Sequence, residues 1–259
     1  MEEAVRVLMR AAELGVTLWD AADAYCLDDS DIGYSEWMCR NAVAALPAEL
    51  GERVVIATKG GTVRPDGGWE QDCSPQHLRE AIDASLIALQ TDCIELYQMH
   101  RPDDKVPFAD SIGAMAQARE QGKIRYIGLS NVSGAQIEEA MAITPIASVQ
   151  NSYSLSNRAP ERDGSLQKCQ ELGLAFLPFS PLGGVKGAKA VGSGGAVAEI
   201  AAELQISPQC VALAWLLGKY DRMIPIPGVT RVASIEDDAK ADEVVLTPEQ
   251  MARLENATL

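Results

Sequence analysis

The sequence predicts an α/β fold, a (β/α)8 TIM barrel that lacks its first barrel strand. Two observations predict it. Helix-like and strand-like segments alternate along almost all of the 259 residues, the pattern of a parallel sheet covered by helices. Polar residues also gather at the carboxyl ends of many strands, and no G-x-G-x-x-G follows any strand, which disfavours a doubly wound sheet. Because 47% hydrophobic residues suit one sizeable core, residues 1–259 are expected to form a single domain.

Seven apolar runs are expected to be strands. They cover residues 16–19, 54–58, 94–99, 124–129, 146–150, 174–179 and 223–226. The chain opens on a helix rather than a strand, and a barrel needs its first strand to close. The expected sheet is therefore one strand short of a full barrel.

Helices are expected before, between and after these strands. They cover residues 2–14, 35–46, 74–89, 109–121, 135–142, 165–172, 196–204, 208–219 and 234–241, with a last helix from 247. The first is amphipathic and stops at Gly15, and Gly122 and Gly173 stop two others. Ser74-Pro75 supplies an N-cap and a proline in the first turn, and Thr247-Pro248 opens the last helix in the same way.

Charge and composition exclude several classes of partner. The net charge of −15 argues against nucleic acid, which needs basic stripes, so an anionic ligand requires a local pocket of positive charge. No apolar run approaches the ~20 residues that span a bilayer, and Met1-Glu2-Glu3 is no signal-peptide start, so we expect a cytoplasmic protein without a membrane partner. The six cysteines are scattered without metal-like spacing, which predicts reduced thiols and no metal site.

Four polar side chains stand where apolar runs give way to loops: Asp20, Tyr25, Lys59 and His100. They will converge if those strands are parallel neighbours, because the carboxyl ends of such strands meet at one edge. A carboxylate, a phenol, an amine and an imidazole held together can pass a proton to a substrate oxygen. This pattern points to a carbonyl reductase.

The segments around these four residues resemble the aldo-keto reductase family over almost the whole chain. The matching segments are Trp19-Asp20-Ala21-Ala22-Asp23-Ala24-Tyr25, Ala57-Thr58-Lys59-Gly60-Gly61, Tyr97-Gln98-Met99-His100-Arg101-Pro102-Asp103, Gly128-Leu129-Ser130-Asn131, Val149-Gln150-Asn151, Phe179-Ser180-Pro181-Leu182-Gly183 and Ile224-Pro225-Ile226-Pro227-Gly228. Each alone is a weak pattern, but seven in the right order are specific. Family members usually begin with a short hairpin and a Gly-rich first strand, and both are absent here.

The resemblance implies reduction of aldehydes and ketones with hydride from NADPH, or from NADH, and a small-molecule carbonyl substrate. Tyr25 would be the proton donor, and a nearby Lys59 would favour its phenolate form. Asp20 would keep Lys59 ionised, and His100 would orient the carbonyl oxygen. Asp23 fits no role in the resemblance and is expected to be a surface or capping residue.

The resemblance also assigns a cofactor site. Ser130, Asn131 and Gln150 would bind the nicotinamide carboxamide, Phe179 would stack on its ring, and Ser180, Pro181, Leu182, Gly183 and Gly184 would approach the pyrophosphate. Ile226, Pro227, Gly228, Arg231, Ser234, Asp237 and Asp238 would lie along the adenosine part, with Arg231 as a clamp for a 2′-phosphate. Lys186 and Lys189, in a Gly-rich loop over 183–195, either add positive charge there or belong to a flexible linker.

Substrate identity, oligomeric state and the choice between NADP and NAD remain open at this stage. Trp69 and Arg101, in loops that would shape the mouth, are weak candidates for substrate contacts. Two other classes of function stay open: a Schiff-base aldolase with Lys59 as its nucleophile, and a non-catalytic dinucleotide-binding sensor or auxiliary subunit.

Overall fold

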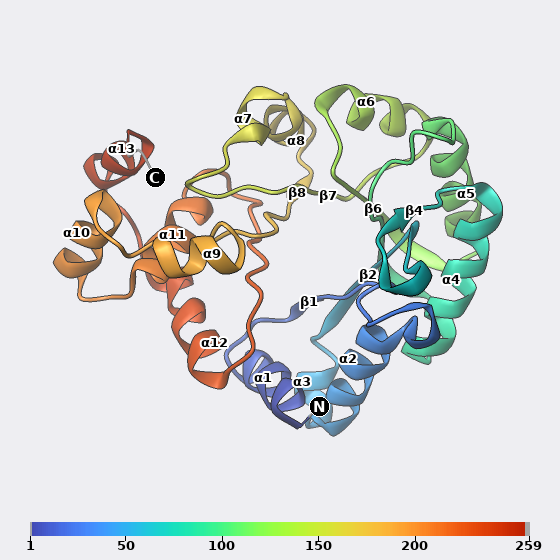
Figure 1. Cartoon of the computed structure of the whole chain (residues 1–259), viewed down its shortest axis with the longest axis horizontal. Coiled ribbons are helices and arrows are strands. Elements are labelled where there is room, and N and C mark those ends of the chain that lie inside the picture. Colours follow the sequence, from blue (N-terminus) through green and yellow to red (C-terminus); the bar gives the residue numbers. More distant parts are fainter. Residues whose placement is uncertain (1, 257–259) are drawn as a thin grey trace.

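The computed structural model of the protein describes residues 2–256. Its centre is a six-stranded sheet, parallel throughout, with the order β1-β2-β5-β6-β7-β8. These strands span Leu18–Asp20, Val55–Gly60, Ile94–Met99, Ile124–Ser130, Ser148–Gln150 and Ala175–Phe176. The sheet curls inside a ring of helices as a half-barrel (Figure 1). The predicted α/β class and the barrel with a missing strand are confirmed.

The last predicted strand, over 223–226, is not a regular strand. It runs parallel to β8 and its extension through isolated bridges, Met223 with Phe176 and Ile226 with Phe179. Pro178 helps to explain the broken ladder: Ile224 and Ile226 donate to Phe176 and Pro178, but Pro178 has no N–H to donate back toward Ile224. The sheet does not close into a barrel. Its other edge strand, β1, pairs only with β2 among the described residues, which leaves a gap between β1 and the segment over 223–226.

The described residues form thirteen α-helices, most of which surround the sheet (Figure 1). They are α1 Glu2–Glu13, α2 Tyr34–Ala45, α3 Ala48–Gly51, α4 Pro75–Leu89, α5 Phe108–Glu120, α6 Gly134–Ile143, α7 Ala159–Arg162, α8 Ser165–Leu172, α9 Gly184–Ala190, α10 Gly195–Leu204, α11 Pro208–Leu217, α12 Val232–Asp238 and α13 Pro248–Glu255. The predicted caps hold: the Ser74 hydroxyl accepts from the His77 N–H, and Thr247 forms a capping box with Gln250. The apolar side chains of these helices recur about every 3.6 residues, so they lie on one face of each helix. That face packs against the strands and forms the core with them.

The first and last parts of the ring meet through helices. Val7 and Ala11 of α1 pack against Ile235 of α12 in a small buried cluster. The two helices lie side by side in Figure 1, below β1 and the extended segment that follows α11. Apolar helix contacts thus join the two ends of the ring, where no strand pairing does in the described chain.

Two local predictions were wrong. The Gly-rich segment expected as a loop over 183–195 contains the helix α9, which begins at Gly184; Gly183 and Gly184 turn the backbone there with positive φ angles of 78° and 72°. The stretch after Lys59, expected as a loop, contains a short antiparallel hairpin, β3 Thr62–Val63 with β4 Glu70–Gln71. No single helix in the described part of the chain is long and apolar enough to cross a membrane.

Candidate active site

The register of the sheet brings the site residues to one edge. Asp20 ends β1 opposite Ala57, Lys59 in β2 lies opposite Gln98 in β5, and Ser130 at the end of β6 lies opposite Gln150. All of these strands run in the same direction, so their carboxyl ends point to the same side of the sheet. Residues more than 100 positions apart in the sequence therefore share one site.

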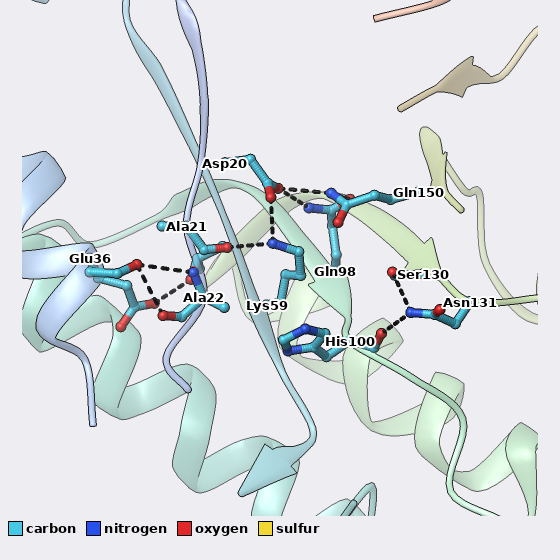
Figure 2. Close-up of polar contacts among 12 residues, drawn as sticks. Asp20, Ala21, Ala22, Glu36, Lys59, Gln98, His100, Ser130, Asn131 and Gln150 are labelled. Atoms are coloured by element: carbon cyan, nitrogen blue, oxygen red, sulfur yellow. Dashed lines mark hydrogen bonds and ion pairs between the residues drawn. The ribbon is translucent and has the colours of Figure 1, made fainter. Parts of the chain in front are cut away.

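Lys59 forms an ion pair at the floor of the site. Its Nζ donates to Asp20 Oδ2 at 2.6 Å and to the Ala21 carbonyl at 2.7 Å, and its side chain is 0% exposed (Figure 2). Burial by itself lowers the pKa of Lys59, but the Asp20 carboxylate and the Tyr25 hydroxyl outweigh burial and raise that pKa above its ordinary value. The ammonium form is therefore the stable one.

The second oxygen of Asp20 is also held. Its Oδ1 accepts from Gln150 Nε2 at 2.8 Å and from Gln98 Nε2 at 3.1 Å, as Figure 2 shows. Both amides are buried, and Gln150 also donates to Gln98 Oε1 at 3.3 Å. With both oxygens bonded, the carboxylate has a fixed orientation toward Lys59.

Tyr25 stands directly above this ion pair. The Lys59 Nζ lies 4.6 Å from the centroid of its ring, and the ring contacts His100 edge to face at 5.5 Å. Tyr25 is 38% exposed, so the phenol is open to solvent while Lys59 beneath it is not. The Tyr25 side chain therefore lies between the buried ammonium of Lys59 and the solvent.

His100 follows β5 and is neutral in this environment. Burial, together with the positive charges of Lys59 and Arg101, lowers the pKa of His100 from 6.5 to about 3. Its Nδ1 has no hydrogen-bond partner among the described residues, and its ring lines the same cavity as Tyr25. A neutral imidazole carries one N–H, so it can donate one hydrogen bond and accept another.

A cavity of about 940 Å³ extends from Tyr25 and His100 along the carboxyl edge of the sheet. The predicted cofactor residues that line it are Ser130, Asn131, Gln150, Phe179, Ser180, Pro181, Leu182, Gly184, Ile226, Pro227 and Gly228. Trp69 and Arg101 line its mouth, where Arg101 donates to Asn131 Oδ1 at 3.0 Å. The structure thus brings these residues together with Asp20, Tyr25 and His100 around one cavity, and Lys59 lies buried beneath Tyr25.

Two lining residues hold unusual backbone conformations. Asn131 has a φ of 59° and Ser180 a φ of 49°, a region that side chains other than glycine rarely adopt. The Asn131 Nδ2 donates to the His100 carbonyl and to Ser130 Oγ, both at 3.0 Å, which helps to hold the first of these turns (Figure 2). Such strained residues cluster at ligand-binding sites.

Other predicted residues lie away from the cavity lining. Gly183 is the N-cap of α9, and Arg231 and Ser234 lie at the start of α12. Asp237 pairs with Lys240 at 3.5 Å, and burial, with the charge of Asp237, raises the pKa of Asp238 to about 6. Lys186 is exposed on α9, and the side chain of Lys189 lies outside the described part of the chain.

Several residues of this site were not predicted. Gln98 is a polar residue in an apolar strand, opposite Lys59, and that position was the available signal. Asp23, expected at the surface or in a cap, is the N-cap of none of the described helices; its Oδ1 accepts from the Ala24 N–H at 2.6 Å within a turn. It is also buried next to Glu36, so the surface alternative was wrong. Arg64, buried in the loop after β3, had no sequence signal.

Comparisons with known proteins agree with this geometry. The Aldo/keto reductase family model matches residues 1–258. An uncharacterized oxidoreductase of Schizosaccharomyces pombe is 34% identical over 255 residues, which cover 98% of this chain and 78% of the relative.

Solved structures give the same result. A thermostable aldo-keto reductase in complex with the inhibitor epalrestat is 30% identical, with a TM-score of 0.80, over 98% of this chain and 86% of that one. An aldo/keto reductase of Klebsiella pneumoniae in complex with NADP and acetate is 25% identical, with a TM-score of 0.81, over 98% and 84% of the two chains. Because the family model spans nearly the whole sequence and a relative above 30% identity aligns along its length, this chain belongs to the aldo/keto reductase family.

Proposed function

We propose that this protein reduces aldehydes and ketones to alcohols with NADPH, and that Tyr25 donates the proton. The observation that carries the proposal is the buried Lys59–Asp20 ion pair beneath the Tyr25 ring, in a cavity that also holds a neutral His100. Membership in an oxidoreductase family supports the class of reaction.

The proton transfer follows from the electrostatics of the site. As the carbonyl oxygen gains negative charge, the Tyr25 hydroxyl gives up its proton to that oxygen. The resulting phenolate is stabilised by the buried ammonium of Lys59, which lies 4.6 Å from the centroid of the Tyr25 ring. Asp20 keeps the ammonium charged and in place. The N–H of the neutral His100 ring donates to the carbonyl oxygen and orients it.

The cavity suits a nicotinamide dinucleotide, which when bound supplies the hydride. Phe179 offers an aromatic face at its wall, and Gly184 and Gly228 have no atom within 4 Å of the place where a side chain would begin, so a ligand has room to approach their backbone. Gln150 uses its N–H groups on Asp20 and Gln98, which leaves its Oε1 to accept from a carboxamide. Ser130 and Asn131 would complete that contact.

NADPH is proposed over NADH on two grounds. Arg231 is exposed at the start of α12 and has no ion-pair partner among residues 2–256, so its guanidinium is available to a 2′-phosphate. The Klebsiella pneumoniae structure described above was solved with NADP, and a second structure of an aldo-keto reductase from that organism, also 25% identical to this chain, was solved with NADPH. Trp69 and Arg101 at the mouth would contact the substrate.

The two alternative functions fit the site less well. An aldolase nucleophile must be a neutral, accessible amine, whereas Lys59 is 0% exposed, ion-paired and has a raised pKa. A sensor that merely binds a dinucleotide has no use for a buried ion pair under a phenol. Borohydride trapping of a substrate adduct on Lys59 would support the aldolase, and NADPH binding without turnover would support the sensor.

The test compares Tyr25→Phe with Tyr126→Phe, a matched removal of a hydroxyl from an exposed tyrosine on β6. Oxidation of NADPH by a panel of aldehydes is followed by absorbance, and cofactor affinity by fluorescence titration. We expect Tyr25→Phe to lose at least about 10²-fold in kcat while its Kd for NADPH stays near the parental value. Tyr126→Phe should behave as the parent. Parental turnover by Tyr25→Phe would overturn the assignment of the proton donor.

A further inference from the structure

We propose that Arg64 is a positioning residue that holds the proton donor Tyr25 and the substrate wall Trp69 as one rigid unit. The proposal rests on the proposed function, because it assigns a role to Arg64 through those two residues. Arg64 follows the strand β3, outside the sheet that carries Lys59 and His100, and it is only 7% exposed.

Every N–H of the Arg64 guanidinium is bonded to a backbone carbonyl. Nε donates to Gly68 at 2.7 Å, Nη1 to Ala24 at 3.1 Å and Cys26 at 2.6 Å, and Nη2 to Leu27 and Gly67, both at 2.9 Å. A guanidinium has five such donors in a fixed plane, so no donor remains for another partner. All five acceptors are neutral backbone carbonyls of two loops, so the guanidinium holds these loops in one arrangement and does not neutralise a carboxylate.

The first loop carries Tyr25. Ala24 and Cys26, whose carbonyls share Nη1, are its two chain neighbours. The other hydrogen bonds of this turn are short-range: the N–H groups of residues 24, 25 and 26 donate to Asp23 Oδ1, the Ala22 carbonyl and the Ala24 carbonyl, and the thiol of residue 26 donates to the Asp28 carbonyl. Arg64 therefore fixes the backbone on both sides of the phenol and so sets the direction in which Tyr25 projects.

The second loop carries Trp69. It wraps around the guanidinium from Pro65 to Gly68, with positive φ angles at Asp66 and Gly67 of 49° and 78°. The Trp69 ring then stacks on the guanidinium, with the Arg64 Cζ 3.9 Å from the ring centroid. Trp69 is 56% exposed and lines the cavity, so its stacking on Arg64 restrains a side chain that is otherwise largely open to solvent.

Because one planar group holds both loops, the distance between the phenol and the indole is set by Arg64. The reaction needs the substrate carbonyl to meet the Tyr25 hydroxyl in a narrow range of geometry, and a misplacement of about 1 Å can cost about 10² in rate. Arg64 thus couples the position of the proton donor to that of the substrate wall, although Arg64 itself does not line the cavity.

The test uses Arg64→Lys, which keeps the charge but loses the planar fork, and Arg64→Met, which loses both. Arg79→Met, at an exposed arginine of α4, is the matched control. We expect kcat to fall by roughly 10²-fold in both Arg64 variants and the KM ratio between small and bulky aldehydes to change, while the Kd for NADPH stays within about twofold. Added ethylguanidinium should restore part of the kcat of an Arg64→Ala variant. Unchanged kcat and aldehyde preference in folded Arg64→Lys and Arg64→Met would overturn the proposal.

Hydrogen exchange gives a second readout that does not require turnover. We expect the amides of Cys26, in the first loop, and of Gly67 and Gly68, in the second, to exchange faster together in Arg64→Met, while those of β5 do not change. Equal acceleration of all amides would mean global destabilisation and would overturn the positioning role. If the parent does not reduce aldehydes, the proposed function fails, and this experiment still decides whether Arg64 couples the two loops.

Discussion

The Lys59 ammonium lies 2.6 Å from the Asp20 carboxylate, and water reaches neither group easily: the lysine side chain is 0% exposed and the aspartate 10%. Surface ion pairs contribute little to stability, but a buried pair behaves differently, because loss of one partner leaves the other charge without compensation. The pair that we propose prepares Tyr25 as proton donor is therefore also a point at which a substitution should destabilise the fold.

Replacing Asp20 by Asn should destabilise the fold in addition to lowering the rate of the proposed reaction. The buried Lys59 cation would lose its counter-charge, and the free energy of unfolding should fall by about 3–5 kcal/mol. Asp83→Asn is a suitable control, because Asp83 pairs with Lys123 at the surface and its loss should cost under about 1 kcal/mol. Urea unfolding of both variants measures the difference. Equal destabilisation of the two would contradict the account of the buried pair.

Asp23 should make stability fall as the pH rises. Burial, and then the charge of Glu36, raises the pKa of Asp23 from 3.8 to about 8 in the folded state. Between these pH values the folded protein binds more protons at the Asp23 carboxyl than the unfolded chain does. The contribution of Asp23 to the free energy of unfolding is therefore complete below pH 3.8 and is lost as the pH rises through about 8.

The variant Asp23→Asn isolates this effect. As the pH rises from 3.8 to about 8, the free energy of unfolding of the parent should fall relative to that of Asp23→Asn. The slope of this difference should reach up to about 1.4 kcal/mol per pH unit. Denaturant midpoints measured from pH 5 to 8 test the slope. A pH-independent difference would show that Asp23 does not titrate as described.

His100 should remain uncharged across the physiological range. Its pKa is lowered to about 3, first by burial and then by Lys59 and Arg101, so its ring gains no proton between pH 5 and 8. Ring resonances in an NMR titration should therefore stay constant for His100. The pKa of His100 is 6.5 in the unfolded chain and about 3 in the folded protein. The contribution of His100 to stability is therefore present above pH 6.5 and is lost as the pH falls toward 3. An inflection of the His100 resonances near pH 6.5 would contradict this prediction.

Gly60, next to Lys59 in β2, should not tolerate a side chain. A Cβ there would lie 1.9 Å from the hydroxyl of the buried Tyr97, so Gly60→Ala should cost about 1–3 kcal/mol through overpacking. Gly113 in α5 has no atom within 4 Å of such a Cβ, and Gly113→Ala should stabilise by about 0.5–1 kcal/mol. Thermal melting compares the two. Adding Tyr97→Phe to Gly60→Ala should recover part of the loss.

The elements of the fold could be predicted where their signals are local. The spacing of apolar residues and caps such as Ser74 and Thr247 located most helices, since those signals act within one or two turns of the chain. The strands β7 and β8 are shorter than the runs that predicted them, and the segment over 223–226 forms only bridges. Pro178 interrupts the bonding between these last two segments, and the length of each ladder depends on pairing between segments that a local pattern does not show.

The sequence by itself determined which polar groups stand at the ends of the strands. Asp20, Lys59 and His100 each follow or end an apolar run, and parallel strands bring their ends to one edge whatever the surrounding loops do. Only the tertiary structure decided how these groups are held. The amides of Gln98 and Gln150 meet Asp20 across the sheet, and the five bonds of Arg64 join loops about 40 residues apart. Such contacts depend on the packing of distant segments, which no periodicity along the chain records.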